Sequence, residues 1–286
     1  MSPPRSAVTL VTCDAQPVLT PSDRALQEEL ESLGASVRVA IWSDPHLDWS
    51  ASELTVIRST WDCSTRVREF EHWLRRIDTE THVCNPVAKI LWNLDKHYLV
   101  DLSRRGIETI PMAYFHPGSP ISLDPAVVPW REVVAKPAIG GSSFAVRRFS
   151  IPNETTPLLE HLNGLLSRTG ALIQRFEETV TTLAERSLVF IGGEYSHAVR
   201  RIPFNTGNTP DLPEFDHAAE EVEIAFATEV LEVSGSRSLP FARVDLLPAP
   251  TGLLLMELEL IEPALFLTRK RAAARSLASS LLALLD

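Results

Sequence analysis

Residues 1–86 alternate between short apolar runs and helical patterns, and this alternation constrains the fold more than any other feature of the sequence. Ala7 to Cys13, Ser36 to Trp42 and Glu53 to Ser59 are apolar runs with β-branched residues, as expected of buried strands. Helices are predicted between them, from about Asp23 to Ser32 and from about Thr65 to Arg76. Strands separated by helices indicate a small parallel sheet that is covered on both faces.

The rest of the chain predicts strands that pair with their neighbours in sequence. A hairpin is expected around Gly192-Gly193, and a second strand pair is expected from Phe241 to Leu247 and from Gly252 to Leu260. Helices are expected over 87–105, 156–169, 216–234 and 270–285, and further strands over 109–113, 133–136, 145–149 and 171–176. The second part is therefore expected to have mixed or antiparallel sheets, which gives an α/β (α+β) protein.

Composition excludes several classes of function. The formal net charge of -10 and a pI near 5.3 argue against nucleic acid as the main partner, because a protein that binds phosphate backbones needs a basic surface. No apolar run approaches the ~20 residues of a membrane helix, and the first residues lack the layout of a signal peptide. Three cysteines, far apart and in no Cys-x-x-Cys arrangement, predict neither disulfides nor a zinc site. We expect a cytoplasmic protein without a membrane partner.

A glycine-serine turn follows Lys136, at the end of a predicted strand. The turn reads Ile139-Gly140-Gly141-Ser142-Ser143. A positive charge, backbone N–H groups and two hydroxyls together suit anionic phosphate oxygens. A turn of this composition is also common as a plain hairpin turn, and neither a Walker-type loop nor a dinucleotide-binding glycine motif accompanies it. The turn alone leaves both interpretations open.

Charged side chains alternate with apolar ones along the last predicted strand pair. Arg243 and Asp245 share one face of their strand, and Glu257 and Glu259 share one face of theirs, because residues two apart project to the same side. If the two strands pair, three carboxylates and one guanidinium converge. Carboxylate oxygens suit Mg²⁺, which also takes phosphate oxygens as ligands. The alternative is a solvated outer face of a sheet.

Other polar residues stand at predicted strand ends, where ligands bind in α/β sheets. Arg58 follows the third strand, and the pair Arg200 and Arg201 ends another and could bind phosphate or carboxylate. Gln174-Arg175-Phe176 ends a strand that could offer backbone groups to adenine. Lys96 falls within a predicted helix, where a single lysine is usually a surface residue.

The order of these features resembles the ATP-grasp superfamily: a helical lysine, a lysine strand with a glycine-rich loop, a hinge strand, Arg-x-Asp and then Glu-x-Glu. The similarity extends over roughly Pro86 to Leu267, and the first unit resembles the domain that precedes ATP-grasp folds. The resemblance implies an N-terminal α/β (pre-ATP-grasp) domain over residues 1–86 and an ATP-grasp domain over residues 87–286. A lid subdomain is implied at about 128–174.

The resemblance also implies contacts with ATP. The two lysines that contact the phosphates in the superfamily match Lys96 and Lys136. The flexible loop matches Gly140, Gly141, Ser142 and Ser143. The hinge that binds adenine matches Gln174, Arg175 and Phe176. The carboxylate that binds the ribose, which comes at the start of a Glu-x-Ser-Leu-Val strand, matches Glu185. The cofactors implied are ATP and Mg²⁺.

A catalytic set and a metal site follow from the same resemblance. The arginine that steadies the transferring phosphate matches Arg243, and the metal ligands match Asp245, Glu257 and Glu259. Most members carry Glu-x-Asn at the last pair, whereas this chain carries Glu-x-Glu, which makes the site more acidic. Glu262 before Pro263 is a further candidate.

Several stretches are similar to one branch of the superfamily, the O-ureido-serine cyclo-ligases of cycloserine biosynthesis and their relatives. They include RSTWD at 58–62, NLDK at 93–96, SLVFIGGE at 187–194, SHAVR at 196–200, ARVD at 242–245 and ELELIEP at 257–263. The branch implies an antibiotic-biosynthesis ligase that activates an amino-acid-like carboxylate as an acyl phosphate. Closure of a C–N bond within the same molecule would follow, as when O-ureido-D-serine gives D-cycloserine. Arg58 and Arg200 are expected to hold the substrate, and Arg200 acts with Lys136 and Arg243 in catalysis.

Two alternatives stay open at this point. One is a bimolecular ligase that joins an amino acid to an amine or peptide through the same ATP site. The other is a nucleotide-binding module without turnover. The segment Ile202 to Phe215 departs from the branch pattern and suggests a substrate-specific loop, and the resemblance implies a monomer or a homodimer.

Overall fold

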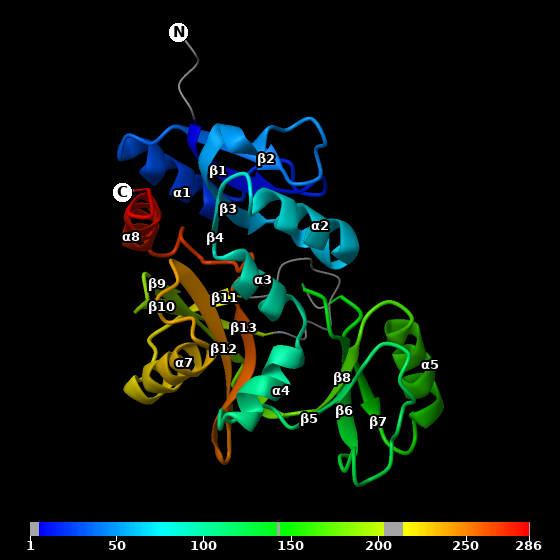
Figure 1. Cartoon of the computed structure of the whole chain (residues 1–286). Coiled ribbons are helices and arrows are strands. Elements are labelled where there is room, and N and C mark those ends of the chain that lie inside the picture. The colour runs from blue at the N-terminus through cyan, green and yellow to red at the C-terminus, as the bar shows by residue number, and fades with distance from the viewer. Residues whose placement is uncertain (1–5, 142–143, 203–213, 286) are drawn as a thin grey trace.

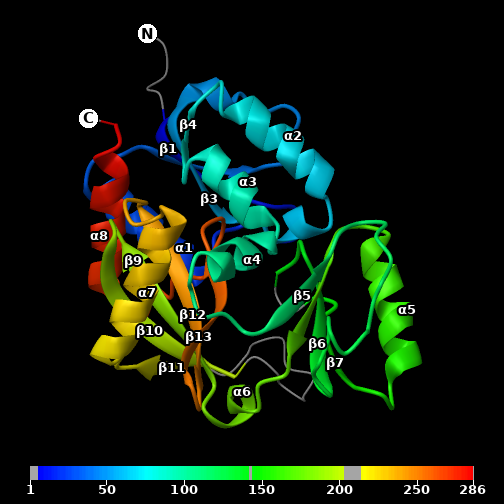
Figure 2. The same ribbon diagram turned by 60° about the horizontal axis from the view of Figure 1, so that its bottom comes forward.

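The computed structural model describes residues 6–141, 144–202 and 214–285. Its strands form three sheets, which Figure 1 shows as three groups along the chain's colour gradient. The first sheet, in blue, lies beside the central sheet in yellow and orange, and the third sheet, in green, flanks the central sheet on another side. Figure 2 shows the same separation after rotation.

The first sheet has the order β2-β1-β3-β4, and all of its strands are parallel. Its elements are β1 (Ser6–Thr12), α1 (Pro21–Ser32), β2 (Val37–Ile41), β3 (Ser52–Ser59), α2 (Val67–Ile77) and β4 (His82–Cys84), with 3₁₀ turns at Trp49–Ala51 and Trp61–Ser64. The predicted parallel sheet is confirmed, and its two faces pack into different apolar clusters because side chains alternate along a strand. Leu10 and Val56 face α1, whereas Val11 and Ile57 face α2.

The central sheet is antiparallel and has the order β11-β10-β9-β12-β13. Its strands are β9 (Glu185–Ile191), β10 (Glu194–Arg201), β11 (Glu214–His217), β12 (Phe241–Ala249) and β13 (Gly252–Glu259). The hairpin predicted at Gly192-Gly193 is confirmed, and both glycines have positive φ, 57° and 80°, as a tight β-hairpin turn requires. Helix α7 (Glu221–Ser234) begins later than predicted, since Glu220 and Glu223 form a capping box there and β11 occupies the preceding residues.

The third sheet has the order β5-β8-β6-β7, and its strands except β5 lie almost entirely within residues 128–174, for which the sequence predicts a lid. It contains β5 (Met112–Phe115), β6 (Glu132–Pro137), β7 (Arg147–Ser150) and β8 (Ala171–Arg175), and α5 (Thr155–Leu166) packs on one face. A short helix, α6 (Thr179–Thr182), leads from β8 back to the central sheet. The apolar cluster of Ile110, Val134, Phe176, Val180, Leu247 and Leu254 joins the third sheet to the central one.

The single helix predicted over 87–105 is wrong. The chain forms α3 (Val87–Leu94) and α4 (His97–Arg104), and the break at Asp95 has extended backbone, with φ -99° and ψ 124°. The carboxylate of Asp95 accepts from the N–H of His97 at 2.8 Å and from the hydroxyl of Tyr114 at 3.0 Å. These bonds give the backbone an alternative to helix hydrogen bonds, which is how Asp ends helices. Lys96 is therefore at the break and not on a helix face.

The last helix, α8 (Arg271–Leu282), packs beside α1 against the first sheet (Figure 1). Leu277, Ala278 and Leu281 belong to the same buried cluster as Leu10 and Val56. The two ends of the chain thus build one core. In the residues that the structure describes, no helix has the length and apolar character needed to cross a membrane.

A buried asparagine ties the first sheet to the central one. Asn85, which directly follows β4, is fully buried and donates from Nδ2 to the carbonyl oxygens of Phe241 at 3.1 Å and Leu260 at 2.9 Å. The two acceptors belong to the start of β12 and to the residue after β13. One side chain therefore fixes the register between two units.

We expect Asn85→Ala to lower the free energy of unfolding by about 2–4 kcal/mol, because two buried carbonyls would lose their donor. Urea unfolding followed by circular dichroism measures this change. Asn153→Ala, at an exposed turn position, serves as the control and should change stability by less than ~0.5 kcal/mol. Equal effects of the two substitutions would contradict the role given to Asn85.

Candidate active site

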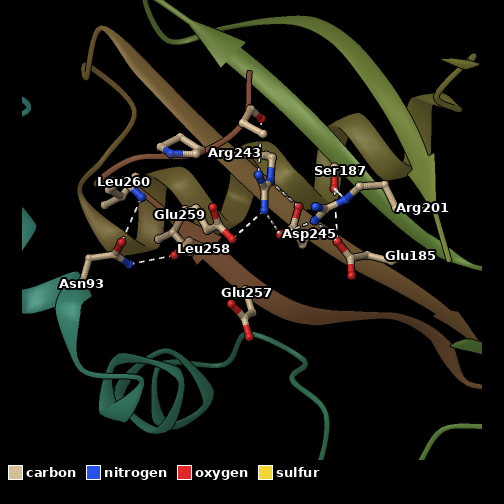
Figure 3. A network of polar contacts seen from close by, with 12 residues as sticks. Asn93, Glu185, Ser187, Arg201, Arg243, Asp245, Glu257, Leu258, Glu259 and Leu260 are labelled. Carbon is tan, nitrogen blue, oxygen red and sulfur yellow. Dashed lines mark hydrogen bonds and ion pairs between the residues drawn. The ribbon is translucent and has the colours of Figure 1, made fainter. Parts of the chain in front are cut away.

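The strand pair β12–β13 places four charged side chains opposite one another. Arg243 pairs across the strands with Glu259, and Asp245 pairs with Glu257. This is the pairing that the alternating charges predicted, and it is confirmed. Figure 3 shows these side chains from close by.

Arg243 is the centre of the network. Its Nε and Nη2 donate to the two carboxylate oxygens of Asp245, each at 2.8 Å, and Nη2 also donates to Glu259 Oε1 at 2.5 Å (Figure 3). The side chain is 3% exposed. Burial alone would lower the pKa of Arg243, but Asp245 and Glu259 outweigh burial and raise it. The guanidinium is therefore a fixed, permanent charge on this face.

A second arginine completes this side of the network, and it is not the expected one. Arg201 lies in an ion pair with Glu185, approaches Asp245 at 3.5 Å and donates to Ser187 Oγ at 3.1 Å. Arg200 points to the other side of β10, where it is exposed and packs over the ring of Phe215. The structure does not bring Arg200 to the site, because neighbouring residues of a strand face opposite ways.

The two predicted lysines meet on one carboxylate. Lys136, on β6, has its Nζ 2.8 Å from Glu257 Oε1, and Lys96 has its Nζ 3.9 Å from Oε2 of the same residue. Burial raises the pKa of Glu257, but the two lysines more than offset burial and lower it to about 2. Lys96 also donates to the carbonyl of Gly140, and its own N–H donates to Ala138 O at 2.8 Å. The lysines and the loop after β6 are thus in contact.

Two further carboxylates lie among fewer cations. Burial raises the pKa of Glu259 to about 7, although Arg243 acts against it. Burial and then the charge of Glu259 raise the pKa of Glu262 to about 8. Near neutral pH both groups are therefore poised between their charged and neutral forms.

Strand β13 is held in place from α3 and α4. Asn93 donates from Nδ2 to Leu258 O at 2.7 Å and accepts from Leu260 N–H at 2.9 Å (Figure 3). The hydroxyl of Tyr98 accepts from Leu258 N–H at 2.9 Å. These bonds fix the strand that carries Glu257 and Glu259.

A cavity of about 220 Å³ opens over this network. It is lined by Trp61, Cys63, Ser64, Asn93, Leu94, Lys96, Tyr98, Ile139, Gly140, Gly141, Arg201, Arg243, Glu257, Leu258, Glu259, Ile261, Glu262 and Ala264. All three parts of the fold contribute. Cys63, Ser64 and Asn93 were not assigned to the site from sequence. Arg201 was named with Arg200 as a possible ligand of phosphate or carboxylate, but only Arg200 was assigned to the site.

Some predicted residues lie elsewhere. Arg58 does not line the cavity: it is 2% exposed, pairs through Nε with Asp23 at 2.8 Å and donates from Nη2 to Pro263 O at 2.9 Å. It supports the loop after β13 and does not face the site. Gln174 is buried within the third sheet, and the N–H groups of Arg175 and Phe176 donate to Pro111 and Glu132.

The hinge residues do not line the cavity, but Phe176 packs with Leu247 and Leu254 of the central sheet. These residues therefore lie beside an apolar layer between two sheets, outside the cavity. Ser142 and Ser143 lie outside the described residues, as does most of the predicted loop at 202–215.

The metal-ligand set was also tested by geometry. Among the residues that the structure describes, no group of three or more His, Cys, Asp or Glu side chains is close enough together to hold a metal ion. Asp245 and Glu259 are bound to Arg243, and Glu257 is bound to the lysines. The oxygen chemistry suits Mg²⁺, and the carboxylates share one face, but protein cations hold each of them.

Comparison with known proteins agrees with the fold. Residues 8–85 match the family model described as D-cycloserine synthetase DcsG, N-terminal domain. The cycloserine biosynthesis protein DcsG of Streptomyces lavendulae is 32% identical over 277 residues, which cover 90% of this chain and 91% of that protein. A crystal structure of D-cycloserine synthetase DcsG has a TM-score of 0.88 and 31% identity, and the match covers 98% of this chain and 99% of that one.

More distant structures share the fold. A RimK domain ATP-grasp protein from Sphaerobacter thermophilus has a TM-score of 0.70 at 17% identity, over 96% of this chain and 100% of that one. The ATP-grasp ligase PsnB, in complex with a minimal precursor, Mg and ADP, has a TM-score of 0.64 at 13% identity, over 100% of this chain and 99% of that one. The ATP-grasp fold expected from the sequence is confirmed.

Adjacent arginines provide a test of the network. We expect Arg201→Ala to lower the free energy of unfolding by about 3–5 kcal/mol, because Glu185 and Asp245 would lose a buried cation. Arg200→Ala, one residue away on the exposed face, should change it by less than ~1 kcal/mol. Parallel guanidinium titrations of the two variants make the comparison, and a larger loss for Arg200→Ala would show that the face assignment is wrong.

Proposed function

Because this chain belongs to the D-cycloserine synthetase (DcsG) family of ATP-grasp ligases, we propose that it activates an amino-acid carboxylate with ATP and then closes a ring within the same molecule. O-ureido-D-serine is the proposed substrate, and D-cycloserine is the product. The observation that carries the proposal is that two lysines and two arginines from four different elements gather around the carboxylates of β12, β13 and β9, beside a cavity that three parts of the fold line.

The phosphates of ATP would lie at the lysine side of the cavity. Lys96 and Lys136 are less than 10% exposed and already converge on one anionic oxygen pair, that of Glu257. The loop at Gly140 and Gly141 lines the same side. Glu257 holds both lysines before the nucleotide arrives, and the phosphate oxygens would compete with Glu257 for them.

The residues proposed for Mg²⁺ are Asp245, Glu257 and Glu259. When bound, Mg²⁺ would neutralise phosphate charge and orient the phosphate chain. Transfer of Lys96 and Lys136 from Glu257 to the nucleotide would release oxygens for the ion. We propose Gln174 to Phe176 for adenine, beside the apolar layer between the sheets. Glu185 is proposed for the ribose, with Arg201 holding its carboxylate in place.

Phosphoryl transfer needs mainly positioning and charge stabilisation, and Arg243 supplies both. An oxygen of the substrate carboxylate attacks the γ-phosphorus, the bond to the β–γ bridging oxygen breaks, and ADP leaves. The nitrogen of the ureido-oxy end then attacks the acyl carbon, phosphate leaves and the nitrogen loses a proton, which gives a ring whose nitrogen still carries the carbamoyl group. Water then cleaves the bond between that nitrogen and the carbamoyl carbon, and the carbamic acid released breaks down to CO₂ and NH₃, which leaves D-cycloserine. Arg243 is held by Asp245, Glu259 and Ala264 O, so it can meet the transferring phosphate without reorganising.

Each part of the chain would have its own role in the reaction. Residues 1–86 would contribute one wall of the substrate site through Trp61 to Ser64, and residues 87–286 would contribute the nucleotide site. The lid at about 128–174 would close over ATP and exclude water, which protects the acyl phosphate from hydrolysis. Contact between Lys96 and Gly140 would couple the lid to the central body.

The proposal is tested by phosphate release from purified protein with Mg²⁺-ATP across single amino acids and then pairs. We expect release with O-ureido-D-serine alone, with one D-cycloserine formed per phosphate, as measured by mass spectrometry. Release only with two substrates together would replace ring closure by a bimolecular ligation. ATP binding without release in any mixture would favour the module without turnover.

Glutamine variants test the proposed metal ligands. The double substitution Glu257→Gln and Glu259→Gln keeps side-chain volume and should lower kcat at least about 100-fold, since it removes two of the three proposed metal ligands. Glu194→Gln, which is 81% exposed on β10, is the control and should stay within about 2-fold of the unmodified protein. Full activity of the double variant would contradict the metal site.

A further inference from the structure

The charges that line the cavity do not balance completely. Within the residues that the structure describes, the cations Lys96, Lys136, Arg201 and Arg243 are matched by four carboxylates that they contact, those of Glu185, Asp245, Glu257 and Glu259. Glu262 also lines the cavity but is in no ion pair with a described residue. Its Oε2 is buried and has no hydrogen-bond partner among them. A buried carboxylate oxygen without a partner carries a large desolvation cost, which a ligand donor could relieve.

Arg58 does not supply the missing partner. Its Nε is bound to Asp23 and its Nη2 to Pro263 O, and no N–O distance to Glu262 falls within ion-pair range. Asp23 forms the ion pair with Arg58, whereas Arg58 Nη1 is buried without a hydrogen-bond partner among the described residues and the charge of Arg58 acts on Glu262 only from a longer distance. Arg243 is matched as well, by Asp245 and Glu259. Glu262 is left as one carboxylate in excess at the cavity wall.

The loop that carries Glu262 is held firmly on both sides. Before it, Leu260 is bound through its N–H to Asn93 and through its oxygen to Asn85. After it, the carbonyl of Pro263 accepts from Arg58, and that of Ala264 accepts from Arg243 at 3.3 Å. Buried side chains thus fix the backbone on both sides of Glu262, whose own Oε2 has no hydrogen-bond partner among the described residues. Support of this kind is what a preorganised binding group needs.

The position of Glu262 differs from that of the phosphate side. Lys96 and Lys136 contact Glu257, whereas the charged groups that act on Glu262 are Glu259, Arg58, Arg243 and Asp23, and Glu262 in turn acts on Cys63. Cys63 and its neighbour Trp61, which is 44% exposed, come from the first unit and line the same cavity. Arg243 and Glu259 lie between the two sides. A group bound at Glu262 would therefore lie on the far side of the substrate's reacting carboxylate from the nucleotide.

From this geometry we infer that Glu262 binds the α-ammonium group of the amino-acid substrate and selects for substrates that carry one. This inference rests on the proposed function. An α-ammonium is directly next to the carboxylate that must reach Arg243, and its three N–H donors match the open carboxylate oxygens. A divalent cation is the competing occupant, but its phosphate ligands would draw it to the lysine side.

The test compares two substrates in two proteins. The substrates are O-ureido-D-serine and its analogue with hydrogen in place of the α-ammonium, 3-(ureidooxy)propanoic acid. In the unmodified protein we expect the amino substrate to have a kcat/KM higher by about 10- to 100-fold, the range for a hydrogen bond between charged groups. In Glu262→Gln this preference should fall to within about 3-fold, while KM for ATP changes less than about 2-fold.

Each of the other results would contradict either the proposed function or the role given to Glu262. Unmodified protein that turns over neither substrate contradicts the proposed function, and the inference falls with it. An unchanged preference in an active Glu262→Gln variant contradicts the inference alone. Equal losses for both substrates, with lower stability, would assign Glu262 to support of the loop beside Arg58. A raised requirement for Mg²⁺ with the preference intact would assign it to the metal. Glu194→Gln serves as the matched control, and its kcat and KM for each of the two substrates should equal those of the unmodified protein.

Discussion

The ion network around Arg243 is the constraint on which the rest of the site depends. A guanidinium with 3% exposure has lost nearly all its water, and bonds to Asp245, Glu259 and Ala264 O replace that water. Removing any one carboxylate would leave a buried charge without compensation, which is much more costly than exchanging the whole network. The strands β12 and β13 and the loop after them are therefore locked together by charge as well as by their hydrogen bonds.

The same network explains why two lysines lie close together. Glu257 holds Lys96 and Lys136 near each other, and like charges so placed would repel without it. Lys136 comes from the third sheet and Lys96 from the break between α3 and α4, so one carboxylate joins two separate parts of the chain. Glu257 therefore holds the two lysines in position, and an anionic ligand could take its place.

Much of this architecture was predictable because it follows from short-range patterns. The period of two in Arg243 to Asp245 and Glu257 to Glu259 fixes which side chains share a face, and the pairing of the strands then brings them together. The parallel first sheet followed from its strand and helix alternation. Short elements such as β4, α6 and β11 have too few residues to give a period, and they were missed.

The failures have physical reasons of a different kind. The helix over 87–105 breaks because Asp95 finds partners in His97 and Tyr114, and Tyr114 is on a distant strand. Arg200 and Arg201 have the same chemistry, and only the tertiary fold shows which one faces Glu185. Arg58 was assigned to the substrate from its place at a strand end, but Asp23 and Pro263 occupy its donors. Sequence patterns give the face of a residue within an element, not its long-range partner.

The packing of α8 against the first sheet has a consequence for how the chain reaches its native state. Leu277 and Leu281, close to the end of the chain, complete the core begun by Leu10 and Val56. During synthesis the N-terminal strands leave the ribosome first, but one face of their sheet stays open to water until the final helix emerges. The first unit therefore cannot mature as an independent domain on the ribosome, and its closure is delayed until the ligase body between the two ends has been made.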